Sequence, residues 1–192
     1  MLYEVLSWEQ IYDMCLELGE KIKGSGYTPD IIVGIARGGW IPARIVSDIL
    51  GNPDLASMKT EFYTDVGETS ARPRITQNVS VSVAGKRVLV VDDVADTGKS
   101  LELIRESMIR QQASDVRIAA LHCKPKSVLR PDFFVAETEA WIVYPHERFE
   151  FLKSRVEKMR REKVPLSGIR IEMLRIGIPE KVIERFLRDP AP

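Results

Sequence analysis

The sequence predicts an α/β protein with a doubly wound, mainly parallel sheet and a C-terminal helical appendage. Three short aliphatic runs without polar alternation, at 31–35, 88–91 and 116–121, predict strands that are buried on both faces. The first two runs each lead through a glycine-containing loop into a segment with helical apolar spacing. Strands joined by helices favour a parallel sheet, whose ligands gather at the carboxyl ends of the strands.

An amphipathic helix is predicted to precede the first strand. Residues Ser7–Gln10 have the form of a capping box, and apolar residues then recur at helical spacing until Gly24. The run 31–35 is followed by the loop Arg37–Gly39 and by helical spacing through Leu50. The economical interpretation is a strand, a tight loop and a helix.

The middle of the chain repeats this pattern after a polar interruption. Residues 60–84 are dominated by Thr, Ser, Asp, Gly, Arg and Pro, with β-branched residues alternating from 75 to 83. They predict a mobile loop near 62–74 that is flanked by strands. Residues 86–93 then predict a buried strand, which enters the loop 94–100 and a third helix.

The last part of the chain is helical and charged. From Glu147 onward the pattern predicts helices at 149–162, 168–176 and 179–187, the last with proline in its first turn. The apolar residues of this appendage are too numerous to remain in water. We therefore expect it to dock through an apolar face rather than to carry catalysis.

Composition restricts the class of protein. The chain has 28 basic and 28 acidic residues, so its net charge gives no general attraction to nucleic acid or to an anionic membrane. It lacks a basic, apolar leader and any run near the roughly 18 apolar residues of a membrane helix, so we expect a cytoplasmic protein. Cys15 and Cys123 lie in apolar segments and are expected to be buried thiols.

The segment Val88–Ser100 carries the chemical argument. It combines four aliphatic residues, the acidic pair Asp92 and Asp93, a short loop and a small, polar turn that opens a helix. Backbone N–H groups at a helix N-terminus attract phosphate, and Gly98 permits close approach of its oxygens. The paired carboxylates would repel a bare phosphate, but they suit vicinal ribose hydroxyls or a hydrated Mg²⁺. Together these features predict a site for a sugar phosphate.

Two other interpretations of this segment are weaker. The end of a Walker A loop requires glycine at position 93, which is Asp here, so a nucleoside triphosphatase is disfavoured. An ordinary capped strand–turn–helix would explain Asp96 or Thr97 alone. It does not explain three carboxylates within five residues at the end of a buried strand, where unpaired charge is costly.

These motifs resemble those of a known family. Residues 88–100 are similar to the phosphoribosyl pyrophosphate (PRPP) signature of type I phosphoribosyltransferases, and 35–39 resemble the pyrophosphate loop of the same family. Residues 121–125 and 140–145 resemble the base-binding elements of bacterial xanthine-guanine phosphoribosyltransferases. The similarity covers approximately residues 10 to 148, and the appendage is a departure from it.

The resemblance implies an activity and a domain organisation. The expected reaction transfers the 5-phosphoribosyl group of PRPP to N9 of a 6-oxopurine (guanine, xanthine or hypoxanthine), with Mg²⁺ and release of pyrophosphate, in purine salvage. The phosphoribosyltransferase domain would span 1–148, with a small hood near 122–146, and the helical extension would span 149–192. A homodimer is also implied, by analogy alone.

Each matching residue receives a role from the resemblance. Asp92 and Asp93 would contact the ribose hydroxyls and the water shell of Mg²⁺, and Asp96 would be the catalytic general base near N7. The 5′-phosphate would be held by Ala95, Thr97, Gly98, Lys99 and Ser100. The pyrophosphate would be held by Ala36, Arg37, Gly38 and Gly39. The peptide between Ala36 and Arg37 is expected to be able to adopt the cis form.

The base would be bound by residues farther along the chain. Lys124 would donate to the purine O6, while Trp141 would cover the ring and the carbonyls near Trp141 and Ile142 would meet exocyclic groups. An ammonium has only donors, so Lys124 favours an oxo group at C6. Tyr63 would close over the pyrophosphate. The alternatives are that Arg37 is an exposed loop residue and that Trp141 is a packed core aromatic.

Two rival functions remain open. A phosphoribosyltransferase for adenine or orotate is opposed only by the residues around Lys124 and Trp141. A PRPP-sensing regulator that binds nucleic acid would use the basic cluster 148–163, but glutamates interleave with those bases, so a solvated helix face explains the cluster. The sequence therefore argues against nucleic acid as a partner.

Overall fold

The computed structural model describes residues 2–63 and 72–188. The chain divides into two compact units. One consists of Glu9–Glu139, and the other joins Met1–Trp8 to Ala140–Pro192. The second unit therefore begins nine residues before the extension predicted from the sequence and includes the N-terminal residues.

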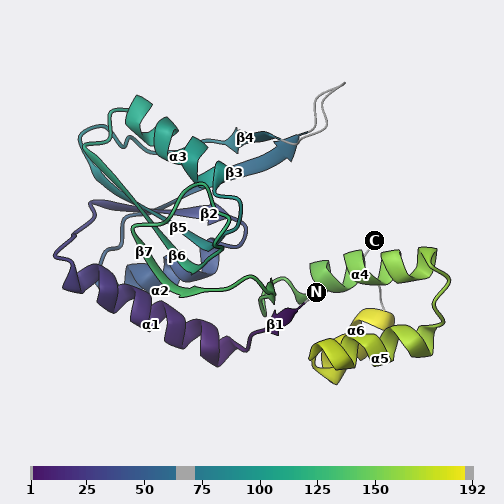
Figure 1. Ribbon diagram of the computed structural model, residues 1–192. Helices are drawn as coiled ribbons and strands as arrows, with labels where there is room; N and C mark the ends of the chain where they lie inside the picture. Colours follow the sequence, from purple (N-terminus) through teal and green to yellow (C-terminus); the bar gives the residue numbers. More distant parts are fainter. Residues whose placement is uncertain (1, 64–71, 189–192) are drawn as a thin grey trace. The chain divides into compact units, whose positions relative to one another are not determined.

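A six-stranded sheet forms the centre of the unit Glu9–Glu139 (Figure 1). Its order is β4-β3-β2-β5-β6-β7, and only β4 runs antiparallel to its neighbour. The strands are β2 (Ile31–Ala36), β3 (Leu55–Tyr63), β4 (Arg72–Gln77), β5 (Arg87–Ala95), β6 (Asp115–Cys123) and β7 (Phe133–Glu137). The mainly parallel sheet is as predicted.

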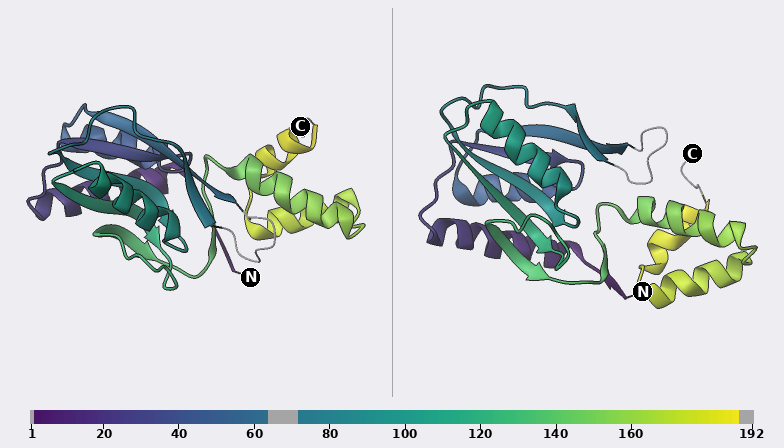
Figure 2. Two further views of the ribbon diagram at one scale, coloured as in Figure 1. Left: turned by 90° about the horizontal axis from the view of Figure 1, so that it is seen from above. Right: turned by 45° about the horizontal axis from the view of Figure 1, so that its top comes forward.

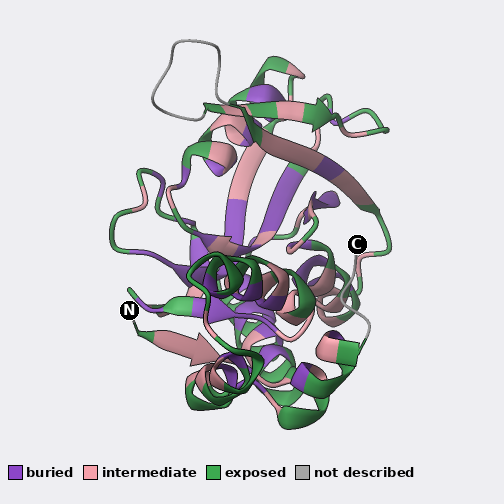
Figure 3. Cartoon of the chain, turned by 90° about the vertical axis from the view of Figure 1, so that its right-hand side faces the viewer, coloured by how far each residue is buried: buried purple, intermediate pink, exposed green. Residues whose placement is uncertain are grey.

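Helices cover both faces of this sheet, which confirms the doubly wound α/β class. Helix α3 (Lys99–Arg110) lies on one face, and α1 (Trp8–Gly24) and α2 (Trp40–Leu50) lie on the other (Figures 1 and 2). Leu101, Ile104 and Met108 of α3 are buried in a core cluster with alternate residues of the central strands. The middle strands are coloured as buried along most of their length in Figure 3. Both cysteines are buried free thiols, as expected.

Several strands are longer than the sequence predicted. Strand β5 continues to Ala95 because Val94 and Ala95 still pair with His122 and Cys123 of β6. Strands β3 and β4 likewise extend into the predicted loop near 62–74, where Tyr63 pairs with Arg72. Cross-strand pairing, which local composition does not encode, lengthens these strands. The rest of that loop, 64–71, lies outside the described residues.

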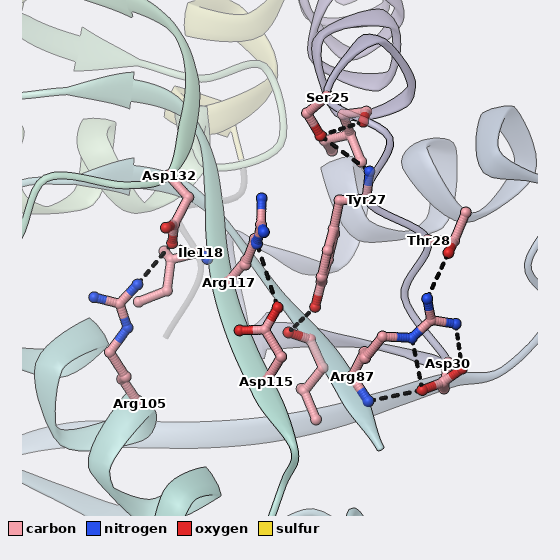
Figure 4. A network of polar contacts seen from close by, with 12 residues as sticks. Ser25, Tyr27, Thr28, Asp30, Arg87, Arg105, Asp115, Arg117, Ile118 and Asp132 are labelled. Carbon is pink, nitrogen blue, oxygen red and sulfur yellow. Dashed lines mark hydrogen bonds and ion pairs between the residues drawn. The ribbon is translucent and has the colours of Figure 1, made fainter. Parts of the chain in front are cut away.

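The amino ends of the strands are closed by polar contacts (Figure 4). The guanidinium of Arg87 forms a two-pronged ion pair with Asp30, at 2.7 and 3.1 Å, and also donates to Thr28. These bonds hold the pKa of Asp30 down at about 2. The hydroxyl of Tyr27 donates to the carbonyl of Val88 at 3.0 Å, and the Arg117 guanidinium lies 4.5 Å from the centre of the Tyr27 ring. Charges at this end are thus matched within the protein.

The second unit has its own core. Strand β1 (Tyr3–Val5) pairs in parallel with β8 (Trp141–Val143), and three helices follow. These are α4 (Arg148–Arg161), α5 (Leu166–Ile176) and α6 (Glu180–Arg188), close to the predicted ranges. The core consists of Val143, Leu152, Val156, Met159, Ile169, Met173, Ile178, Ile183 and Phe186, with Tyr3 and Val5 packed against it. Much of the apolar face predicted for the appendage is buried here, but Phe149, Leu166, Ile171 and Leu174 are exposed. Over the described ranges, no helix is both long and apolar enough to span a membrane.

Candidate functional site

The sheet order places the two predicted phosphate loops side by side. Strand β2 leads through α2 to β3 on one side, whereas its other neighbour β5 leads through α3 to β6 on the opposite side. The connections therefore diverge at the carboxyl ends of β2 and β5. This divergence creates the crevice where open α/β sheets bind ligands.

The loop after β2 lies against the end of β5. The peptide between Ala36 and Arg37 is cis, as expected from the resemblance. A Cβ atom on Gly38 would collide with the carboxylate of Asp93, and one on Gly39 would collide with the carbonyl of Val91 and the backbone of Ile35. Only glycine fits this close approach at either position. Arg37 projects from the loop as an exposed side chain.

The acidic pair occupies the end of β5. Asp93 is buried, at 7% exposure, and Asp92 is partly buried. The backbone N–H of Asp93 donates to the Asp92 carboxylate at 3.0 Å. Burial, followed by repulsion from Asp93, nevertheless raises the pKa of Asp92 well above its usual value. Two carboxylates crowded together at a strand end can bind a cation or accept hydrogen bonds from hydroxyl groups.

The segment 124–129 packs against the loop after β5 and holds it by backbone hydrogen bonds. The N–H of Lys124 donates to the carbonyl of Ala95 at 2.9 Å, and the N–H of Val128 donates to that of Thr97 at 3.0 Å. Gly98 has a φ of 76°, and a Cβ there would meet Ser127 and Leu129 at 2.5 and 2.6 Å. Glycine is therefore required at position 98 for both its conformation and its packing.

Helices α2 and α3 both begin at this edge. Their N-caps are Gly39 and Gly98, and within the described part of the chain no side chain caps either helix. Lys99 and Ser100 form the first residues of α3. Because N-terminal N–H groups and the helix dipole attract anions, both loops suit phosphate groups.

Asp96 has a partner that the sequence analysis missed. The ammonium of Lys126 lies 3.0 Å from the Asp96 carboxylate, and both side chains are largely exposed. The sequence does show a second lysine two residues after Lys124. No local pattern, however, indicated that the segment 124–129 folds back and brings this lysine to the loop after β5. The pair can fix the carboxylate of Asp96 while leaving it open to solvent.

The remaining predicted residues are distributed over both units. Lys124 is buried at 9% exposure at the end of β6, in the first unit. Trp141 and Ile142 belong to β8 of the second unit. Ile142 is buried, but the Trp141 side chain is 54% exposed, which does not fit a packed core aromatic. The base site that these residues would share stays a prediction.

Tyr63 lies at the end of β3 rather than in a loop. Its hydroxyl donates to the Glu61 carboxylate at 2.8 Å, and the Arg74 guanidinium lies 5.6 Å from its ring centre. These contacts tie Tyr63 to the β3–β4 pair. Its closing role over pyrophosphate stays a prediction.

The donor set at the end of β5 fits Mg²⁺. Across the residues described, no group of three or more His, Cys, Asp or Glu side chains gathers to hold a metal. Magnesium, however, commonly takes one or two carboxylates together with waters and phosphate oxygens. Asp92 and Asp93 supply two such carboxylates, and a cation would offset the burial and the repulsion that raise the pKa of Asp92.

Comparisons with known proteins show the family of this chain. A family model described as "Phosphoribosyl transferase domain" matches residues 3–150. A purine phosphoribosyltransferase from Pyrococcus horikoshii Ot3 is 39% identical with a TM-score of 0.68, over 76% of this chain and 94% of that one. A hypothetical protein from Neisseria gonorrhoeae with bound ppGpp is 27% identical with a TM-score of 0.69, over 76% and 89%.

A Helicobacter pylori xanthine-guanine-hypoxanthine phosphoribosyltransferase is 21% identical with a TM-score of 0.67. That alignment covers 79% of this chain and 99% of the other, and it shows the shared fold. The family match ends at residue 150, so almost all of α4 and the whole of α5 and α6 lie beyond it.

Proposed function

This chain belongs to the phosphoribosyltransferase family, and we propose that it transfers the 5-phosphoribosyl group of PRPP to N9 of a 6-oxopurine, releasing pyrophosphate, in purine salvage. The 39% identical relative is a purine phosphoribosyltransferase. Guanine, xanthine and hypoxanthine are the proposed bases.

One observation carries the proposal. The buried carboxylate of Asp93 lies directly against Gly38, so the acidic end of β5 and the glycine loop after β2 form one continuous surface. Such a surface can meet a ribose through the carboxylates and a pyrophosphate through the loop N–H groups at the same time. PRPP carries both groups on adjacent atoms.

The residues around this surface would divide the ligand between them. The turn from Ala95 to Ser100, at the N-terminus of α3, would hold the 5′-phosphate, and Ala36–Gly39 would hold the pyrophosphate. Arg37 would add charge-assisted hydrogen bonds to the leaving group. When bound with PRPP, Mg²⁺ would neutralise pyrophosphate charge, held through water by Asp92 and Asp93.

Asp96 is the proposed general base. As the bond from N9 to the anomeric carbon forms and the bond from that carbon to pyrophosphate breaks, the proton on N7 would pass to the Asp96 carboxylate. Lys126 would hold this carboxylate in place, since its ammonium lies 3.0 Å away. The protein's contribution is otherwise positioning and electrostatic stabilisation.

Lys124 is the residue proposed to recognise the substituent at C6 of the purine. It is buried, so a base that offered it a second donor would leave polar groups unsatisfied, at about 1 to 3 kcal/mol each. A 6-oxopurine should therefore outperform adenine by about 100-fold or more in kcat/KM. Trp141 and Ile142 would supply ring cover and backbone carbonyls without choosing among oxopurines.

An activity panel tests the proposal. Xanthine, guanine, hypoxanthine, adenine and orotate are compared with PRPP and Mg²⁺ on the wild type and on Lys124→Gln, whose amide offers a donor and an acceptor. Selective use of 6-oxopurines that weakens in Lys124→Gln supports it. A preference for adenine or orotate would replace the base class, and absence of transfer together with salt-dependent nucleic-acid binding would favour a regulator.

A further inference from the structure

A groove of about 410 Å³ lies within the unit that contains the helical extension. Its lining comes from α4, from Glu147 at the N-cap of that helix, and from the two residues that pair across β1 and β8, Tyr3 and Trp141. Three basic residues of α4 in this lining lie beyond residue 150, where the family match ends: Arg155, Lys158 and Arg161. The family resemblance therefore assigns them no role.

One end of the groove is aromatic. Tyr3 and Phe151 pack edge to face with ring centres 5.7 Å apart, and the half-exposed indole of Trp141 lines the same groove. Glu147 and Glu150 lie at this end. Aromatic faces stack on nucleobases, and carboxylates accept hydrogen bonds from amino and hydroxyl groups. This end therefore suits a nucleoside.

The other end of the groove is basic. Arg155, Lys158 and Arg161 line it at intervals of three residues, which correspond to a rise of about 4.5 Å per step along the helix. Three cations along one groove suit a ligand that carries several phosphate groups. The Nε atom of Arg155 is buried and has no hydrogen-bond partner among the residues that the structure describes, while its Nη2 atom lies 3.5 Å from Glu172. The contact of Nη2 with Glu172 is at the long limit of a hydrogen bond, so the guanidinium that lines the groove can also pair with an anion there.

The groove changes the interpretation of the basic cluster 148–163. Bases near the C-terminus of a helix also stabilise its dipole, which would account for Lys158, Arg160 and Arg161 equally. The structure separates them, because Lys158 and Arg161 line the groove and Arg160 does not. Arg155 lies before the last turn, so the dipole does not account for it.

We propose that this groove binds a nucleoside triphosphate, with its base and ribose at the aromatic end and its phosphates along Arg155, Lys158 and Arg161. The polarity follows from α4 itself, since Glu150 and Lys158 are separated by a rise of about 12 Å. The volume lies within the usual range for small-molecule sites. Trp141 is also a proposed base-binding residue, so the ATP titrations are made without a purine base. The proposal itself does not require that the chain transfer phosphoribose.

Calorimetric titration of the full chain with ATP tests the site. The variant Lys158→Glu/Arg161→Glu should bind ATP at least about tenfold more weakly, because two cations that face phosphates become anions. The matched control is Arg160→Glu/Lys163→Glu, which makes the same change in net charge at exposed positions outside the groove lining. It should bind within about twofold of the wild type. Equal losses in the two variants would overturn the proposal.

Four further titrations fix the ligand class. Inorganic triphosphate and adenosine should each bind more weakly than ATP, since each fills one end of the groove. Saturating PRPP with Mg²⁺ should leave ATP binding unchanged; competition would mean that ATP occupies the PRPP site, and the proposal would fail. Stronger binding of a single-stranded oligonucleotide than of ATP would also refute it. Phosphoribosyl transfer by both variants is measured separately, so failure of either function is distinguishable.

Discussion

Aspartates at the two ends of the central sheet have opposite electrostatic surroundings. At the amino end, Asp30 is matched by the guanidinium of Arg87, which lowers the pKa of Asp30 to about 2. At the carboxyl end, Asp92 lies beside Asp93, and burial and repulsion raise the pKa of Asp92. Residues of the same type thus have opposite pKa shifts at the two ends of one sheet.

The difference separates stability from function. A carboxylate with a low pKa stabilises the fold at neutral pH, whereas one with a raised pKa destabilises it in its charged form. Crowded acids are tolerated at a ligand-binding edge because a cation or hydroxyl donors can compensate them when substrate arrives. Substitutions at the two ends should therefore change different measurements.

The largest effect is expected at Asp96. Asp96→Asn should lower kcat by roughly 100-fold or more, the usual scale for a general base, with a smaller change in PRPP affinity. Lys126→Met, which removes the ion-pair partner that positions Asp96 but keeps the carboxylate, should lower kcat by less than Asp96→Asn does. Steady-state kinetics of both variants decide the matter. Unchanged turnover in Asp96→Asn would remove the base assignment.

The contact between the two loops gives the second prediction. Gly38→Ala would push a Cβ atom into the Asp93 carboxylate, so kcat/KM for PRPP should fall by about tenfold or more as both loops shift. Gly24→Ala is the matched control, because no atom lies within 4 Å of a Cβ there. Kinetics at varied PRPP concentration measure the loss. Wild-type kinetics in Gly38→Ala would mean that the two loops do not bind one ligand.

Much of the fold could be predicted because its signals are local. Aliphatic runs identified β2, β5 and β6, and apolar spacing identified the helices within a few residues of their ends. The pairing of β1 with β8 could not be predicted. Three residues carry no periodic signal, and their partner lies more than a hundred positions away, so the N-terminus was not expected to join the second unit.

Parts of the candidate site could likewise be predicted from local sequence, and other parts could not. Its two loops were found because glycines and acids in fixed order follow buried strands, and the strand order then brought Gly38 against Asp93. The contact of Lys126 with Asp96 depends on how the segment 124–129 folds beneath Gly98, which is a tertiary property. The groove beside α4 was hidden for a similar reason. Helical spacing alone could not show which bases of the cluster line it.

The third prediction is a substitution that stabilises the folded protein, whereas most substitutions destabilise it. Asp92→Asn should raise the melting temperature of the ligand-free protein at pH 7 by a few degrees, since it removes a charge that burial and Asp93 disfavour. The wild type regains this stability as the pH falls through the raised pKa of Asp92 towards its ordinary value near 3.8, so the gain should fade in that window. PRPP and Mg²⁺ use should weaken at the same time. Thermal melts at several pH values measure the first effect, and a lower melting temperature would contradict it.

The smallest effect is expected at the amino end. Asp30→Asn should lower the melting temperature by about two degrees or less at pH 7, because the pair with Arg87 is exposed to solvent and such pairs contribute little. The folded pKa of Asp30 is about 2 and its ordinary value is 3.8, so the contribution is present above pH 4 and is lost as the pH falls towards 2. Kinetic constants should not change, since Asp30 precedes β2 and lies at the opposite end of the sheet from the PRPP loops. Asp48→Asn, which breaks an exposed helical pair with Arg44, is the control for a generic lost charge. If Asp30→Asn impaired transfer as strongly as Gly38→Ala, the separation of stability at one end from chemistry at the other would be wrong.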